Sequence, residues 1–156
     1  MARRSAGILL YRRAGQEPEV LLVHPGGPFW ARKDDGAWSI PKGEYGDDEE
    51  PRAAALREFE EELGTKAPGH AEGLLDLGEV KQRSGKVVIA FALEGDLDPD
   101  RITSNTFPME WPPRSGRTQE FPEVDRAGWF APAEARTKLV SAQAELVDRL
   151  LLRLTA

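Results

Sequence analysis

Residues 51–63 predict a helix whose two ends are both marked in the sequence. Pro51 suits the first helical turn, because its fixed φ is helical and its missing N–H would have no partner there. Asp47 and Asp48 are available to cap the N-terminus, and Gly64 suits the position where a helix stops. A helix with both ends marked fixes which of its side chains share a face.

One face of this helix is apolar and the other carries carboxylates. At about 100° per residue, the apolar face holds Leu56, Phe59 and Leu63, which predicts packing onto a sheet. The opposing face holds glutamates at positions i, i+3 and i+4, namely Glu58, Glu61 and Glu62. Like charges at these spacings destabilise a bare helix by roughly 0.2–0.5 kcal/mol per pair. The cluster alone is therefore either a solvated acidic surface or a carboxylate platform for Mg²⁺ or Mn²⁺, which take oxygen ligands.

The residues around the glutamates favour the second explanation. The segment runs Gly43, five residues, Glu49, seven residues, then Arg57-Glu58-Phe59-Glu60-Glu61-Glu62-Leu63-Gly64-Thr65. It resembles the Nudix box, G-x5-E-x7-R-E-U-x-E-E-x-G-U, where U is apolar. Every invariant-type position matches, which would arise by chance on the order of 10⁻⁷ per window. Phe59 fits the first apolar position, whereas Thr65 departs from the pattern at the last one.

The resemblance to the Nudix hydrolase family implies a fold, a reaction and a set of site residues. The implied fold is of the α/β (α+β) class, an α/β/α sandwich with a mixed sheet flanked by helices, over a single domain of residues 1–156. The implied reaction is hydrolysis of a nucleoside diphosphate linked to another group, with Mg²⁺ or Mn²⁺ as cofactor. By position, the metal ligands would be the carbonyl of Gly43 and the carboxylates of Glu58, Glu61 and Glu62. Arg57 would orient these glutamates through its planar fork, with Glu49 as its partner.

The catalytic base has two candidate sources. Diphosphate hydrolysis needs a positioned water, charge neutralisation and a base, but no protein nucleophile. A glutamate of the helix, Glu61 or Glu58, is one candidate. In some Nudix enzymes a glutamate of a later loop serves as base or extra ligand, and Pro122-Glu123-Val124-Asp125 resembles that loop. This makes Glu123 the candidate there and Glu120 the reserve, while a plain surface role for a loop glutamate is equally open.

Substrate contacts are expected from two long loops, residues 25–37 and 112–123. Lys42 adjoins the box and suits a phosphate. Further phosphate contacts are expected from the cations of the two loops, namely Arg32, Lys33, Arg114 and Arg117. Trp30 and Trp111 border the loops and are the candidates for stacking a base. Core positions are predicted for Trp38 and Trp129, and structural or surface roles for His24 and His70.

The rest of the sequence predicts strands and helices without regular alternation. Strands are predicted at residues 5–11, 19–24, 38–40, 73–81, 86–94, 106–111 and 126–131. Residues 133–154 predict one or two helices. This mixture indicates a mixed sheet flanked by helices, in agreement with the resemblance.

Composition narrows the class of protein further. The chain has no cysteine, which excludes disulfides, thiolate nucleophiles and zinc-thiolate sites. Its net charge of −6 argues against duplex DNA as a partner, but not against a small phosphorylated ligand. No apolar run approaches the roughly 20 residues that span a membrane, and no secretory signal is recognisable, so a cytoplasmic protein is expected. The sequence is compatible with a monomer or a homodimer.

The substrate is less constrained than the reaction. Pro41-Lys42-Gly43 is similar to the dinucleoside polyphosphate, diphosphoinositol and RNA 5′-end hydrolases of the family, and dinucleoside polyphosphates or nucleoside triphosphates are the expected substrates. Two subgroup marks are missing, because residues 80–83 hold no tyrosine and Glu79 stands where ADP-ribose enzymes carry proline. The whole chain resembles a bacterial group of predicted pyrophosphohydrolases.

The same fold is compatible with two other functions. The alternative to an enzyme is a non-catalytic nucleotide-sensing module, although such modules are expected to lose box carboxylates. An isopentenyl diphosphate isomerase would need a cysteine, which this chain lacks.

Overall fold

The computed structural model describes residues 3–68 and 71–155, so His70 lies outside the described residues. These residues form eight strands and three helices, together with short 3-10 turns at Ala71–Gly73 (η1), Pro99–Arg101 (η2) and Ser141–Gln143 (η3). The strands are β1 (Arg4–Ala14), β2 (Glu17–Pro25), β3 (Lys42–Glu44), β4 (Leu75–Lys81), β5 (Val87–Glu94), β6 (Thr106–Glu110), β7 (Thr118–Pro122) and β8 (Val124–Phe130). The helices are α1 (Pro51–Leu63), α2 (Pro132–Lys138) and α3 (Ala144–Thr155). In this part of the chain, no helix is long and apolar enough to cross a membrane.

The main sheet has the order β4-β5-β1-β2-β8, with β3 paired to one end of β1. The neighbours β1 and β5 run parallel, whereas the other pairs in this sheet are antiparallel. The predicted mixed sheet is therefore confirmed. β3 pairs with the start of β1, Ala6 facing Gly43, and this pairing places the first box residue beside the central strand.

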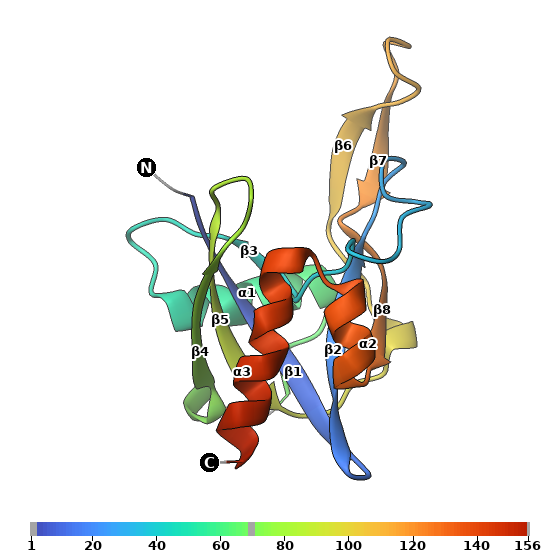
Figure 1. The fold of residues 1–156 in the computed structure, drawn as a ribbon. Helices are drawn as coiled ribbons and strands as arrows, with labels where there is room; N and C mark the ends of the chain where they lie inside the picture. The colour runs from blue at the N-terminus through green and yellow to red at the C-terminus, as the bar shows by residue number, and fades with distance from the viewer. Residues whose placement is uncertain (1–2, 69–70, 156) are drawn as a thin grey trace.

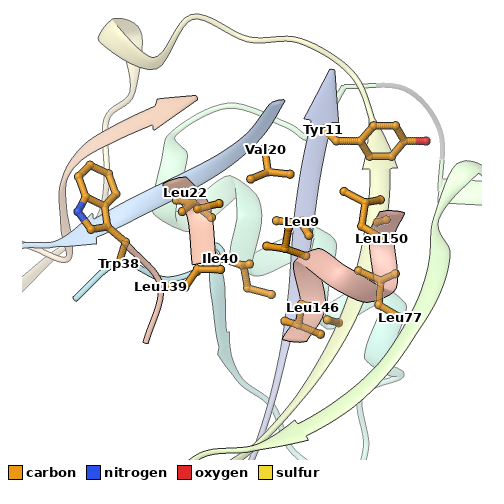
Figure 2. Packing of buried hydrophobic residues seen from close by; sticks show 14 of the residues in the cluster. Leu9, Tyr11, Val20, Leu22, Trp38, Ile40, Leu77, Leu139, Leu146 and Leu150 are labelled. Atoms are coloured by element: carbon orange, nitrogen blue, oxygen red, sulfur yellow. The ribbon is translucent and has the colours of Figure 1, made fainter. Parts of the chain in front are cut away.

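Each face of the sheet is covered by helices, as Figure 1 shows. Alternate side chains of β1 point to opposite faces, as strand geometry requires. Ile8 and Leu10 belong to a buried cluster with Phe59 of α1, while Leu9 and Tyr11 belong to a second cluster with α2 and α3. Figure 2 shows this second cluster, in which Leu146 and Leu150 of α3 pack against the sheet. The predicted α/β/α sandwich is thus confirmed.

The predicted loop over residues 112–123 is partly wrong. Residues 118–122 form β7, which pairs antiparallel with β6 and places Phe107 opposite Phe121. The two strands form a separate hairpin that projects from the body of the molecule (Figure 1). β7 is largely exposed and does not pack on a core, so its sequence lacks the alternation of apolar and polar residues that marks a strand. The three prolines within residues 112–123 also favour a loop in the sequence.

Two local predictions around the box are also wrong. Residues 38–40 do not form a strand, because Trp38 and Ser39 make only isolated bridges, to Leu139 and Val23. The helix is capped by Glu50 instead of Asp47 or Asp48: its side chain accepts hydrogen bonds from the backbone N–H groups of Arg52 and Ala53. Since Pro51 occupies the first helical position, the residue immediately before it becomes the cap.

Candidate active site

Helix α1 presents its acidic face to a cavity because its other face is held in the core. Ala54, Ala55, Phe59 and Leu63 are buried against the sheet. Gly64 ends the helix in the left-handed conformation at φ 73°, a backbone state that glycine adopts without steric cost. With the rotation of the helix fixed in this way, Glu58, Glu61 and Glu62 all reach the same hollow.

That hollow, which we call the carboxylate cavity, has a volume of about 390 Å³. It is lined by Ser5, Lys42, Gly43, Glu44, Glu58, Glu61, Glu62, Lys86 and Glu123. Six predicted site residues therefore meet in one cavity from α1, β3 and the β7–β8 junction. Ser5 of β1 and Lys86 before β5 were missed by sequence reasoning, since neither belongs to a motif and both arrive through sheet pairing.

Arg57 binds three of the box carboxylates at once. Its Nε and Nη2 donate to the two carboxylate oxygens of Glu49, each at 2.9 Å. Its Nη1 donates to Glu58 Oε1 at 2.8 Å and to Glu61 Oε1 at 3.2 Å. The bidentate bond to Glu49 lowers the pKa of that carboxyl. Arg57 is thus anchored on one side and holds two glutamates of the helix on the other.

Gly43 and Glu58 are packed so closely that no larger residue fits at position 43. A Cβ atom on Gly43 would lie 2.0 Å from the carboxyl carbon of Glu58. Glu58 is a buried side chain, and this burial raises the pKa of its carboxyl, opposed by the hydrogen bond from Arg57. The absence of a side chain at Gly43 is therefore what lets a carboxylate lie against the β3 backbone.

Lys42 and Glu62 form a second hydrogen-bonded pair in the carboxylate cavity. The backbone N–H of Lys42 donates to Glu62 Oε1 at 3.2 Å. Burial lowers the pKa of the Lys42 ammonium, with Lys86 adding to this effect, and burial raises the pKa of Glu62 to about 8. Burial therefore favours the neutral form of both groups, as expected of charges removed from water.

The burial of Glu62 predicts how the stability of the metal-free protein depends on pH. In the unfolded chain a glutamate ionises near pH 4.3, so from there up to about pH 8 the folded state keeps a proton that the unfolded state has lost. The free energy of unfolding therefore falls as the pH rises through this window. Glu62→Gln stays neutral, so it should be more stable than wild type by up to about 5 kcal/mol above pH 8, with no difference near pH 4.

Urea unfolding in EDTA at a series of pH values measures this difference. Glu60→Gln is the matched control, because Glu60 is on the same helix but exposed to solvent. A Glu62→Gln protein that is less stable than wild type above pH 8 would contradict the expectation.

The carboxylates do not converge on a single point in this arrangement. Among residues 3–68 and 71–155, no three acidic or histidine side chains are placed closely enough to hold a metal ion. The hydrogen bonds explain why: Glu58 and Glu61 are turned toward Arg57, and Glu62 toward the N–H of Lys42. The donor set is nevertheless one of hard oxygen atoms around one cavity, which suits Mg²⁺ or Mn²⁺ in kind.

Glu123 lies where three cavities meet. It lines the carboxylate cavity and two further hollows, both of which are also lined by Trp30. Partial burial raises the pKa of its carboxyl, and the neighbouring charge of Glu61 adds to this rise. Glu120, the reserve candidate, is instead an exposed residue of β7 opposite Pro108 and lines none of these three cavities.

The two further hollows differ in chemistry. The amide cavity, about 290 Å³, is lined by Val23, Pro25, Trp30, Ala37, Ser39, Lys42, Glu62, Gln82, Glu123, Val124, Val140 and Gln143. The aromatic cavity, about 440 Å³, is lined by Pro25, Gly26, Gly27, Pro28, Phe29, Trp30, Phe107, Met109 and Glu123. Trp30 lines both of them and is partly exposed. Of the predicted stacking residues, Trp30 therefore reaches the site directly.

The other predicted substrate contacts lie farther from the carboxylates. Trp111 packs edge-on against Phe29, with ring centroids 6.0 Å apart. Arg114 and Arg117 are exposed in the turn of the projecting β6–β7 hairpin, and Arg32 and Lys33 are exposed on the 25–37 loop. Lys33 lies over Trp30, with its Nζ 5.0 Å from the ring centroid. None of these four cations lines any of the three cavities described above.

His24 anchors the loop that carries Trp30. It is fully buried, and its Nδ1 lies 2.9 Å from Asp125 Oδ1 while its Nε2 lies 2.6 Å from the Lys33 carbonyl oxygen. Trp38 is buried beside it, edge-on at 5.2 Å. Trp129 is half-buried in β8 beneath the guanidinium of Arg12. These three residues support the structure around the site, and none of them lines the cavities.

Comparison with known proteins shows that nearly the whole chain matches one family of domains. A family model for the NUDIX domain matches residues 1–150. A search of curated protein sequences gives no match. Many solved structures match this chain, and the three described below have low sequence identity to it.

Three of these solved structures illustrate the likeness. The Ap4A hydrolase of C. elegans in a binary complex is 20% identical, with 97% of this chain and 98% of that chain covered at a TM-score of 0.66. The NUDIX domain of Shewanella oneidensis NrtR, complexed with ADP ribose, is 17% identical over 99% and 89% at a TM-score of 0.64. A MutT/nudix family protein of Listeria innocua is 16% identical over 98% and 94% at 0.61. At these identities the likeness establishes the fold.

Proposed function

Because the chain belongs to the NUDIX domain family, which includes hydrolases acting on diphosphate bonds, we propose that it cleaves a diphosphate linkage in a nucleotide derivative with the help of a divalent cation. Residues 1–156 would act as one catalytic domain. One observation carries the proposal. The box carboxylates Glu58, Glu61 and Glu62 line the same cavity as Gly43, Lys42 and Glu123, although they come from three separate parts of the chain.

A cation bound there would be Mg²⁺ or Mn²⁺, held by the carbonyl of Gly43 and by Glu58, Glu61 and Glu62. When bound, it supplies charge neutralisation on the phosphoryl oxygens and lowers the pKa of a water. The fit is supported by the hard oxygen donors and by the space that Gly43 leaves for the Glu58 carboxylate. Arg57 is the positioning residue, because it holds Glu58 and Glu61 while Glu49 holds it.

The remaining residues of the cavity suit proton transfer and phosphate binding. Glu61, Glu58 and Glu123 are the candidates for the base that takes a proton from the attacking water. The raised pKa of Glu123 supports its assignment, since a base is most effective when its pKa approaches the working pH. Lys42 is placed to bind a phosphate oxygen, and the exposed cations of the two loops, Arg32, Lys33, Arg114 and Arg117, would contact outlying phosphates only if those reach beyond the cavities.

Dinucleoside polyphosphates and nucleoside triphosphates are the proposed substrates. The Ap4A hydrolase likeness supports the former class, and the NrtR domain complexed with ADP ribose shows that a protein of this fold can hold a nucleotide. Trp30 and Trp111 are the proposed aromatic contacts. We further propose that the protein is a cytoplasmic monomer or homodimer that does not bind duplex DNA, in keeping with its net charge of −6.

A substrate panel tests this function. The protein is incubated with nucleoside triphosphates, diadenosine polyphosphates, ADP-ribose, NADH, diphosphoinositols and 5′-triphosphate RNA, each with Mg²⁺, with Mn²⁺ or with EDTA. Products are separated by anion-exchange chromatography. At least one diphosphate is expected to be cleaved with either metal and none with EDTA.

The same panel distinguishes the enzyme from the nucleotide-sensing alternative. Tight binding of a nucleotide by calorimetry, without turnover of any compound in the panel, would favour the sensor. Turnover that is equal in EDTA and in Mg²⁺ would overturn the proposed role of the metal.

A further inference from the structure

The projecting β6–β7 hairpin has one apolar face that belongs to neither buried cluster of the main sheet. Phe107 and Met109 are alternate residues of β6, so they share a face of the strand, and Trp111 continues the alternation beyond it. Phe121 of β7 stands opposite Phe107, with the two ring centroids 6.1 Å apart. These four side chains are partly buried, whereas the residues that alternate with them on β6 are exposed, namely Thr106, Pro108 and Glu110.

The loop after β2 meets the hairpin at two places. At the root, the Gly26 N–H donates to the Glu123 carbonyl oxygen at 3.0 Å. A Cβ atom on Gly26 would lie 2.0 Å from the Pro122 carbonyl oxygen, so the two backbones touch there. Toward the tip, Phe29 of the loop packs edge-on against Trp111. Figure 1 shows this loop beside the hairpin, and the aromatic cavity is lined by residues of both.

The aromatic cavity has the size and the lining of a ligand pocket. Its volume of about 440 Å³ lies within the range of roughly 300–1,000 Å³ that ligand pockets occupy. Its side chains are aromatic or aliphatic, apart from the thioether of Met109 and the carboxylate of Glu123. Two of them, Phe29 and Trp30, are large apolar residues that remain 63% and 38% exposed. Exposed apolar side chains gathered around one hollow are typical of a binding site.

The position of the cavity indicates which part of a substrate it would hold. Glu123 lines both this cavity and the carboxylate cavity, so a group held here would be attached close to the diphosphate. In a nucleotide derivative that group is a nucleoside. Aromatic side chains stack on the face of any base, and a methionine thioether also makes favourable contacts with aromatic rings. The amide cavity offers Trp30 as its aromatic wall, and its other lining side chains are aliphatic or polar.

We propose that the aromatic cavity is the site that binds the base of the substrate and that the β6–β7 hairpin forms one of its walls, with Phe107 and Met109 contacting the base together with Trp30. This inference rests on the proposed function and specifies how its substrate is held. It assigns two binding residues, Phe107 and Met109, to a hairpin that no box position predicts. Since stacking uses the face of a ring and not its edge, adenine should bind about as tightly as guanine.

Met109 provides a direct reporter of an occupied cavity. The chain contains two methionines, Met1 and Met109, so a protein labelled with 13C-methyl methionine gives at most two methyl signals. Met109→Leu removes one of them and thereby assigns it. A base stacked on the Met109 methyl group should shift its proton signal upfield through the ring current. AMP in EDTA should produce this shift, whereas ribose 5-phosphate, which is AMP without the base, should not.

Titration calorimetry with the same ligands measures the contribution of the base. AMP and GMP should each bind about tenfold more tightly than ribose 5-phosphate, which is the usual effect of stacking one base on an aromatic side chain. None of these ligands contains a diphosphate bond, so cleavage cannot interfere. Geranyl monophosphate, which carries a flexible apolar chain in place of the nucleoside, should bind more weakly than AMP.

Two variants test the wall that the hairpin supplies. Phe107→Ala removes an aromatic ring from the cavity and should lower the ratio of AMP to ribose 5-phosphate affinity about tenfold. Met109→Ala should lower the same ratio while keeping the contact between Phe107 and Phe121, in case the first variant disturbs the hairpin. The matched control is Leu152→Ala, which removes an exposed apolar side chain of α3 that lines none of the three cavities and should leave the ratio unchanged.

The outcomes separate this inference from the proposed function. Equal affinity for AMP and ribose 5-phosphate, a Met109 signal that stays in place when AMP binds, or tighter binding of geranyl monophosphate than of AMP would overturn the base site, even if the enzyme cleaves diphosphates. A shifted Met109 signal together with a ratio that falls in both hairpin variants would support it, even if no compound of the substrate panel is hydrolysed.

Discussion

Glu61→Gln is expected to lower kcat/KM by about 10²–10⁴-fold at saturating Mg²⁺, the range in which removal of a catalytic acid or base usually falls. Glutamine keeps the length of the side chain but cannot take a proton or neutralise a cation. Glu61 lines the carboxylate cavity, accepts from Arg57 Nη1 and lies near Glu123, whose pKa it raises. Steady-state kinetics on the best substrate of the panel measures the loss.

The control for this substitution is on the same helix. Glu60 is exposed and points away from the cavity-lining set, so Glu60→Gln should turn over like wild type. Glu123→Gln, measured in parallel, distinguishes a base on the helix from a base at Glu123. A loss of kcat in Glu123→Gln at an unchanged Mg²⁺ requirement identifies Glu123 as the base, because Glu123 is not among the proposed metal ligands. Unchanged turnover in Glu61→Gln would refute the proposed site.

Gly43→Ala is expected to be nearly as damaging, although it adds only a methyl group. The new Cβ would lie 2.0 Å from the carboxyl carbon of Glu58, so either the carboxylate or the β3 backbone must move. A displacement of about 1 Å in a reacting constellation can lower the rate about 10²-fold, and overpacking of this kind costs about 1–3 kcal/mol of stability. Thermal unfolding in EDTA and kcat with Mg²⁺ measure the two effects separately.

Gly73→Ala is the control for the loss of conformational freedom at a glycine. The nearest atom to a Cβ at Gly73 is 3.5 Å away, an ordinary contact, so this variant should keep both activity and stability. Wild-type activity in Gly43→Ala would mean that Glu58 does not need its present position.

Helix α1 could be predicted from the sequence because its determinants are local. Pro51, Gly64 and the spacing of Phe59 and Leu63 fix its limits and rotation within a few residues of one another. Both predicted limits, 51 and 63, are those of the structure. The carboxylate set followed from the same spacing, since any helix over these residues brings Glu58, Glu61 and Glu62 to one side.

The predictions that were wrong concern segments whose hydrogen-bonding partners are distant in the sequence. Residues 38–40 alternate like a strand, but their hydrogen bonds go to Val23 and to the chain after α2, so they make isolated bridges and no ladder. β7 was missed because its side chains are exposed and its strand partner is not part of a core. The predicted 126–131 strand, by contrast, is present as β8, which begins two residues earlier, at Val124, and ends one residue earlier, at Phe130.

The same distinction applies to the site. Ser5, Lys86, Gln82 and Gln143 reach the cavities through the pairing of β1 with β3 and β5 and through the packing of η3, none of which leaves a mark near these residues in the sequence. Ser5 Oγ is buried without a hydrogen-bond partner in the described residues, a feature that only coordinates reveal. The box residues could be predicted from their local sequence, whereas the residues that line the neighbouring cavities are brought there by long-range contacts.

The parallel pairing of β1 with β5 has a consequence for how this protein is made. β1 is the central strand, yet its neighbour on one side is β5, Val87–Glu94, which is synthesised much later. A hairpin of β1 and β2 can form as soon as both have emerged, but it exposes an apolar strand edge that only residues 87–94 can cover. The first strand of the sheet to be translated therefore keeps one edge unpaired until β5 has been added, and an unpaired edge of this kind promotes aggregation of partly folded chains.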